Sequence, residues 1–317
     1  MDTQFTKAVR RSVPMLISLA GVSGSGKTYS ALLVASGLAG PNGKVGFIDT
    51  ENQRGSLYAD SPGVMAALPN GYEIIQLTPP FSPARYIECI QAAEDQGITV
   101  LIIDSASHEW EGIDGCCEIA EKNKLRGLPN WSMAKREHKK FMNYLLSTNL
   151  HLVFCLRARE KVKIVEVVKE NGKKATEVVP IGIQAIAEKS FVFEMLVSLR
   201  VEEETHFAVP IKVPEPLVHL FPGGKLLTRE DGERIRKWNE GGRPLEDNEQ
   251  LKKRSRAIAE LGTEAYREFF VALPKAQQKA LAGPWHDENK FIAEQADRPT
   301  DELTVGEQPD GTLVVSK

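Results

Sequence analysis

The stretch Gly21-Val22-Ser23-Gly24-Ser25-Gly26-Lys27-Thr28 matches the pattern G-x-x-x-x-G-K-S/T at every fixed position. Its three glycines let the backbone curl so that successive amide groups point at one bound phosphate. An apolar run precedes the stretch at 13–20 and a helical pattern follows at 27–38, so the positive end of that helix faces the same spot. The stretch predicts a nucleotide site from Gly21 to Tyr29. Lys27 reaches the β- and γ-phosphates there, and the Thr28 hydroxyl is a Mg²⁺ ligand.

A magnesium ion at such a site needs an acidic partner on a neighbouring strand. Residues 100–104 are four apolar residues followed by an aspartate, Asp104. This pattern predicts a rigid buried strand that presents one carboxylate at its carboxyl end, where ligands of open α/β sheets bind. We therefore expect Asp104 to be the second metal residue beside Thr28.

Hydrolysis also needs a group that orients or deprotonates the attacking water. The candidates are Glu51, Glu109 and Glu111. Glu51 follows the apolar run at 44–49 and should emerge at the same sheet edge as the phosphate loop, so the pattern favours it. The alternative is that Glu51 only caps the next turn. Arg157 follows another apolar run and should reach the same edge, where its positive charge can contact the γ-phosphate and sense its presence.

Strand and helix patterns alternate through the first half of the chain. Strands are expected at 13–20, 44–49, 72–77, 99–104 and 150–156, with helices at 27–38, 83–96 and 131–147. This alternation predicts an α/β fold with a mostly parallel sheet covered on both faces. Two further strand pairs, at 162–168 with 176–179 and at 191–201 with 206–213, are expected to extend the sheet in antiparallel fashion.

The carboxyl-terminal third reads as helices. Thr228 and Asp231 form a capping-box pattern that starts a helix through Trp238. We expect an amino-terminal arm at 1–12, a core at 13–240, a helical module at 247–296 and an acidic tail without regular structure at 297–317. Breaks within the module are expected at Gly262, Pro274 and Gly283.

Composition excludes several classes of protein. The 317 residues are 42% hydrophobic and 26% charged, as in ordinary globular domains rather than disordered or collagenous chains. No apolar run is long enough for a membrane helix, and the amino terminus lacks a signal-peptide pattern. We expect a cytoplasmic protein with no membrane contact. The four cysteines fit no zinc pattern, and we expect them to be reduced and mostly buried.

Positive charge is concentrated in one segment. The whole chain has a formal net charge of −3, yet residues 121–190 contain 15 Lys and Arg against seven Glu. Such an asymmetry is typical of a surface that binds an acidic polymer. The candidate DNA contacts on the predicted hairpin are Arg159, Lys161, Lys163, Lys173 and Lys174. A solvated, charge-rich hairpin explains the same residues equally well.

These residues together resemble the RecA-type recombinase core, and most closely the fourth class of phage Sak single-strand-annealing ATPases. The resemblance covers about residues 13–240. It is carried by the loop at 21–28, by Asp49-Thr50-Glu51, by the run 104–112, and by Arg157-Ala158-Arg159.

The resemblance implies a DNA-stimulated ATPase that uses ATP and Mg²⁺, with Glu51 as catalytic carboxylate. It implies binding of single-stranded DNA by the segments after Asp104 and after Arg157, annealing with a single-strand-binding protein, and a phage or prophage origin. It also implies a ring or filament of identical subunits with ATP between neighbours, and Lys189 or Arg159 as a charge supplied in trans.

The chain departs from the family in two places. RecA has glutamine where Arg157 falls, so the coupling between nucleotide and DNA differs. We expect no amino-terminal assembly domain; Phe5-Thr6-Lys7-Ala8 matches the Phe-x-x-Ala plug of eukaryotic recombinases, or is an unstructured terminus. Two other functions remain open: a motor of the same fold that acts on a protein, or a nucleotide-sensing adaptor.

Overall fold

The computed structural model describes residues 7–168, 174–242, 247–273, 275–298, 304–307 and 313–316. The chain divides into two compact units, residues 1–245 and 246–317.

The first unit is built on one sheet whose strand order is β3-β2-β4-β5-β1-β7-β8. The strands are β1 (Leu16–Gly21), β2 (Val45–Asp49), β3 (Glu73–Gln76), β4 (Val100–Asp104), β5 (His151–Val168), β7 (Val197–Val201) and β8 (Ala208–Lys212). All neighbours are parallel except β7 and β8, which are antiparallel. The predicted α/β fold with a mostly parallel sheet and an antiparallel extension is confirmed.

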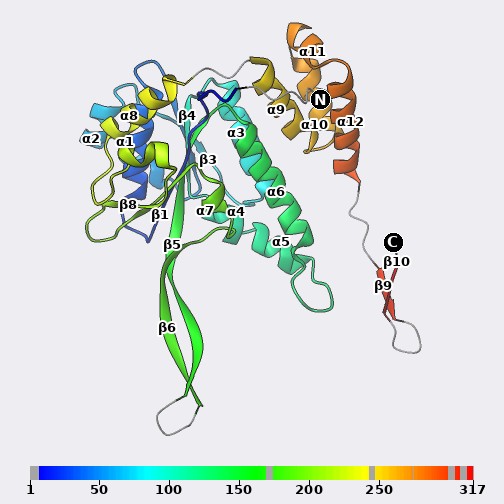
Figure 1. Ribbon diagram of the computed structural model, residues 1–317, viewed down its shortest axis with the longest axis horizontal. Helices are drawn as coiled ribbons and strands as arrows, with labels where there is room; N and C mark the ends of the chain where they lie inside the picture. Colours follow the sequence, from blue (N-terminus) through cyan, green and yellow to red (C-terminus); the bar gives the residue numbers. More distant parts are fainter. Residues whose placement is uncertain are drawn as a thin grey trace. The chain divides into compact units, whose positions relative to one another are not determined.

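Helices cover both faces of the sheet (Figure 1). One face is covered by α1 (Lys27–Ala39), α2 (Pro62–Ala67) and α8 (Arg229–Glu240), and the other by α3 (Pro83–Asp95) and α6 (Trp131–Ser147). Shorter elements are η1 (Arg54–Tyr58), α4 (Ser107–Glu111), α5 (Cys116–Lys122), α7 (Phe191–Glu194) and η2 (Glu215–Leu220). Every residue of β1, β2 and β4 is buried, as a two-sided parallel sheet requires.

The capping box predicted at the start of α8 is confirmed, with reciprocal bonds between Thr228 and Asp231. The prediction for residues 191–201 is wrong in part. Phe191 to Glu194 form one helical turn, α7, and only β7 is a strand. Phe191 is buried edge-on against Phe154 at 5.3 Å between ring centroids, so tertiary packing overrides the strand propensity of its neighbours.

The pairing of β7 also differs from the prediction. It lies parallel to β1, and only β8 runs antiparallel. After α7 the chain has returned to the amino-terminal end of β1, where the amide of Leu196 donates to the carbonyl of Leu16 at 2.9 Å. From there β7 runs in the same direction as β1.

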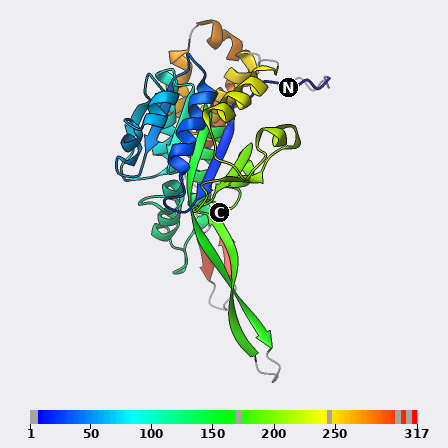
Figure 2. The same cartoon turned by 90° about the vertical axis from the view of Figure 1, so that its left-hand side faces the viewer.

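The strand β5 continues beyond the sheet and forms a two-stranded arm with β6 (Lys174–Ala185). Both views show this arm projecting away from the helices (Figures 1 and 2). The antiparallel pairing runs from Ala158 opposite Ala185 to Val168 opposite Lys174, with an irregularity after Lys161. We call this arm the β5–β6 hairpin.

The second unit contains the helices α9 (Asp247–Ala259), α10 (Thr263–Ala272), α11 (Lys275–Leu281) and α12 (Pro284–Asp297). They end and begin near the breaks that the sequence predicts. The tail differs from the prediction, because β9 (Thr304–Glu307) and β10 (Leu313–Ser316) form an antiparallel pair. Their β-branched residues favour strands, and acidic composition alone does not show this. In the described part of the chain, no helix is both long and apolar enough to cross a membrane.

Candidate nucleotide site

The glycine-rich loop joins β1 to α1, with the backbone shape that its sequence predicts. Gly24 and Gly26 have φ angles of +86° and +88°, where a side chain is strained. A Cβ on Gly21 would lie 2.7 Å from the carbonyl oxygen of Val201. The loop therefore needs glycine at these places, and the first amides of α1 have no partner within the helix. Those amides are free to bind an anion.

Lys27, Thr28 and Asp104 meet beside this loop. The ammonium of Lys27 donates to the carbonyl of Val22 at 2.7 Å, and the hydroxyl of Thr28 donates to Oδ2 of Asp104 at 2.6 Å. Burial lowers the pKa of Lys27. Burial also raises the pKa of Asp104 to about 6, although the hydrogen bond from Thr28 opposes the shift. A cation bound beside this carboxylate would offset the free-energy cost of burying its negative charge.

Glu51 and Arg157 form an ion pair at the same edge. Arg157 Nε donates to Oε1 of Glu51 at 2.7 Å, and its Nη2 donates to the other carboxylate oxygen. Burial would raise the pKa of Glu51, but the hydrogen bond and charge of Arg157 outweigh it and hold that pKa below its ordinary value. The carboxylate is therefore ionised and held by the arginine.

The segment that presents Glu51 is shaped by Asp49, a residue that spacing alone does not single out. Asp49 Oδ1 accepts from the amide of Glu51 at 2.7 Å, and Oδ2 accepts from the amide of Gly55 at 2.8 Å. The chain after β2 is thereby folded back toward the loop. Next to it, Thr50 Oγ1 lies 2.7 Å from Nδ1 of His108 and accepts from the amide of Ser105 at 2.8 Å.

These residues surround a cavity of about 630 Å³. Its lining is Ser23, Gly24, Gly26, Lys27, Thr28, Glu51, Arg54, Leu57, Tyr58, Asp104, Arg157, Ala158 and Ile186. Three lining residues of η1, namely Arg54, Leu57 and Tyr58, are not predicted from the sequence, where only their closeness to Glu51 points to them. Nor is His206, whose Nδ1 lies 3.0 Å from the carbonyl oxygen of Ser25 and so contacts the loop.

Tyr29, assigned to the nucleotide site from the sequence, is not part of this lining. Its ring is tilted against Tyr58 at 6.2 Å between centroids, and its hydroxyl lies over Gly63 at the start of α2. Because Tyr29 is one residue beyond Thr28 on a helix, it faces away from the loop.

Of the three carboxylates proposed to activate water, Glu51 is the one that lines the cavity. Glu109 is buried beside Cys116 and His138. Glu111 is ion-paired with Arg159, with Arg159 Nη2 donating to Oε1 at 2.7 Å. The other candidate DNA contacts lie on the hairpin. Lys161 and Lys163 are on β5, Lys173 is outside the described residues, and for Lys174 only the backbone in β6 is described.

A comparison with protein families shows that residues 14–204, more than half of the chain, match the family described as AAA domain. The chain belongs to the AAA domain family. Its core is accordingly a P-loop ATPase domain, a class of domain that binds nucleotide and Mg²⁺.

Among solved structures, the KaiC-like protein of the archaeon Pyrococcus horikoshii OT3 is similar at 15% identity and a TM-score of 0.38, covering 66% of this chain and 90% of that one. No curated protein matches.

The donor set of the cavity fits a magnesium nucleotide. Lys27 and the amides at the start of α1 suit phosphate oxygens, while the hydroxyl of Thr28 and the buried carboxylate of Asp104 are oxygen ligands of the kind that Mg²⁺ prefers. Mg²⁺ bound there would neutralise charge on the phosphates. Arg54 and Arg157 also line the cavity and add positive charge that suits the outer phosphates.

Proposed function

We propose that this chain is a Mg²⁺–ATP-dependent ATPase that binds single-stranded DNA and acts in phage homologous recombination or strand annealing, like the fourth class of phage Sak proteins. One observation carries the proposal. The strand β5 places Arg157 in the nucleotide cavity and then continues, without interruption, into a basic hairpin. A single element thus connects the phosphate site to a surface suited to DNA.

The β5 strand of the hairpin presents three basic residues on one face. Arg159, Lys161 and Lys163 alternate along β5, and side chains two residues apart in a strand point to the same side. At ~3.3 Å per residue, Lys163 lies about 20 Å along the strand from Arg157. Basic side chains on such a face suit the phosphates of an extended nucleic-acid strand.

In this proposal Glu51 orients or deprotonates the attacking water. While Arg157 holds both of its carboxylate oxygens, Glu51 is not available for that task. The γ-phosphate of ATP is a competing anion for the same guanidinium. Exchange of Arg157 from Glu51 to the γ-phosphate would release the carboxylate and pull on β5, whose far end forms the hairpin.

We also propose an assembly of identical subunits with ATP between neighbours, and a single-strand-binding protein as partner. Arg159 is already ion-paired with Glu111 of its own chain, so exposed Lys189 is the better donor of charge in trans. Mass photometry with and without ATP tests this, with growth of the assembly on ATP as the expected result. Particles that stay monomeric with ATP and DNA would contradict it.

A second candidate is an ATPase that acts on a protein partner, and the other face of the hairpin favours it. Val162, Ile164 and Val178 are 54%, 68% and 63% exposed. Ile164 lies opposite Val178, and directly opposed residues share a face. Apolar side chains on an exposed arm are typical of a protein-docking surface.

The ATPase rate measured against single-stranded DNA concentration separates the two candidates. The proposal predicts that DNA raises the rate, and that Lys161→Ala with Lys163→Ala removes the stimulation while the basal rate stays. Lys44→Ala is the matched control, because Lys44 is an exposed lysine at the opposite edge of the sheet, just before β2. A rate that does not respond to DNA would favour the protein partner.

A further inference from the structure

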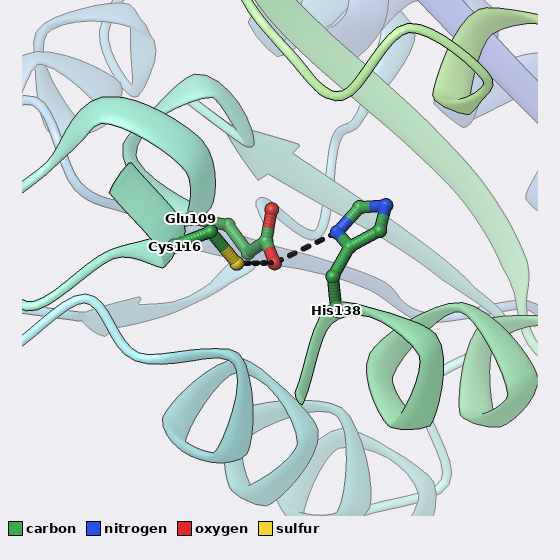
Figure 3. A group of neighbouring side chains, drawn as sticks. All are labelled: Glu109, Cys116 and His138. Carbon is green, nitrogen blue, oxygen red and sulfur yellow. Dashed lines mark hydrogen bonds and ion pairs between the residues drawn. The ribbon is translucent and has the colours of Figure 1, made fainter. Parts of the chain in front are cut away.

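A cluster of side chains lies outside the nucleotide cavity, where α4, α5 and α6 meet. Glu109 comes from α4, Cys116 from α5 and His138 from α6. Figure 3 shows the carboxylate of Glu109 between the sulfur of Cys116 and the imidazole of His138. The distances are 3.1 Å from Glu109 Oε1 to Cys116 Sγ and 3.0 Å from Glu109 Oε1 to His138 Nδ1.

All three side chains are withdrawn from water. Their exposed fractions are 2% for Glu109, 0% for Cys116 and 6% for His138. Burying a carboxylate is costly unless a cation or several hydrogen bonds compensate it. The cluster does not satisfy all of its polar atoms, since among the described residues Nε2 of His138 is buried without a hydrogen-bond partner.

The donor atoms are of the kinds that bind zinc in proteins. Zinc takes thiolate sulfur at about 2.3 Å, imidazole nitrogen at about 2.0–2.1 Å and carboxylate oxygen at about 2.0–2.2 Å. The sulfur, the oxygen and a ring nitrogen of the cluster all lie within 4.8 Å of one another. Small rotations of the three side chains are therefore enough to bring them around one ion.

The surroundings fit a metal centre as well. Trp110 lies edge-on to the His138 ring at 5.6 Å between centroids, and Ala120 and Ala134 pack beside Cys116. This apolar shell keeps bulk solvent away and strengthens electrostatic attraction within it.

We propose that Glu109, Cys116 and His138 bind one zinc ion, with water at the fourth position, and that this ion ties α4 and α5 to α6. These two helices have five and seven residues, which is too short for stability on their own. The ion would also steady the segment between Asp104 and the hairpin, because α4 contributes Glu111 to the ion pair with Arg159. This proposal does not depend on the proposed function.

Metal content of the full-length chain, without a histidine tag, tests the site. After growth with zinc and extensive dialysis, we expect about one zinc per chain by mass spectrometry of the metal. Cobalt(II) added to metal-free protein should give the charge-transfer absorption of a cobalt–thiolate bond. Zinc should raise the melting temperature of the metal-free protein.

Two variants and a matched control locate the site. Cys116→Ser should lose the cobalt–thiolate absorption, and His138→Gln should lose the bound zinc. Cys117→Ser should keep both, since Cys117 is the adjacent, less buried cysteine. Circular dichroism and binding of a non-hydrolysable ATP analogue show that each variant is folded. Wild-type protein without zinc and without the cobalt absorption would overturn the proposal, as would equal loss in Cys117→Ser.

Discussion

The nucleotide cavity and the β5–β6 hairpin share a strand but are specified in different ways. In the cavity, Lys27, Thr28, Glu51, Asp104 and Arg157 each have a defined partner within hydrogen-bond distance. In the proposed function, the hairpin acts through the side chains that share one of its faces. We therefore expect substitutions in the cavity to act through the loss of single hydrogen bonds. On the hairpin we expect them to act through the change in charge or in exposed apolar area. The variants below test this difference.

The largest expected effect is that of Glu51→Gln on turnover. An amide keeps the shape of the carboxylate but cannot accept a proton from water, so kcat should fall by about 10²–10⁴-fold. ATP should still bind, because Lys27 and the Thr28–Asp104 pair are unchanged. A steady-state phosphate-release assay beside a binding titration measures both, and an unchanged kcat would remove Glu51 from the mechanism.

Lys27→Ala should impair both ATP binding and turnover, through loss of the phosphate contact. The lysine is the charged donor beside the loop, and a hydrogen bond to a charged group contributes about 1.5–3 kcal/mol, so affinity should fall about 10–100-fold. Displacement of a fluorescent ATP analogue measures the change, with Lys44→Ala as control. Equal affinity in Lys27→Ala and the wild type would contradict the assignment of Lys27.

A smaller and graded effect is expected on the hairpin. Lys161→Ala combined with Lys163→Ala removes two phosphate contacts, so the slope of log affinity against log salt should become shallower by about 1.4 for single-stranded DNA. Fluorescence anisotropy over a salt series measures it. Ile164→Ser on the opposite face should leave this slope unchanged, and an equal loss in both variants would show that the faces do not differ.

The smallest effect concerns pH and connects the two regions. Arg157 keeps the pKa of Glu51 low against the effect of burial, so in Arg157→Gln burial should dominate and that pKa should rise. Glu51 acts only when it is deprotonated, so kcat/KM, which reports the free enzyme, should begin to fall at a higher pH on acidification than in the wild type. A pH–rate profile of both proteins tests this, and coincident acidic limbs would contradict it.

The parts that the sequence predicted are those whose geometry follows from neighbouring residues. The loop from Gly21 to Thr28 needs only the strand before it and the helix after it. Asp104 and Glu51 were located because parallel strands end at one edge of the sheet. The side-chain direction of Tyr29 does not follow from the motif, because one further residue on a helix turns the side chain by about 100°.

Other features depend on contacts between distant residues. Asp49 shapes the segment that carries Glu51, but only the folded chain shows that both of its oxygens accept amides. The cluster of Glu109, Cys116 and His138 has no recognisable spacing, because three separate helices bring it together. The turn at Phe191 follows from burial against Phe154, and its strand-like sequence points the other way.

The claim on which the account rests is that the loop beginning at Gly21 holds the phosphates of a magnesium nucleotide. Isothermal titration calorimetry of the wild-type chain with a non-hydrolysable ATP analogue tests it directly. The account predicts saturable binding of about one nucleotide per chain when Mg²⁺ is present, and weaker binding when Mg²⁺ is chelated. Titrations that show no binding in the presence of Mg²⁺ would contradict it.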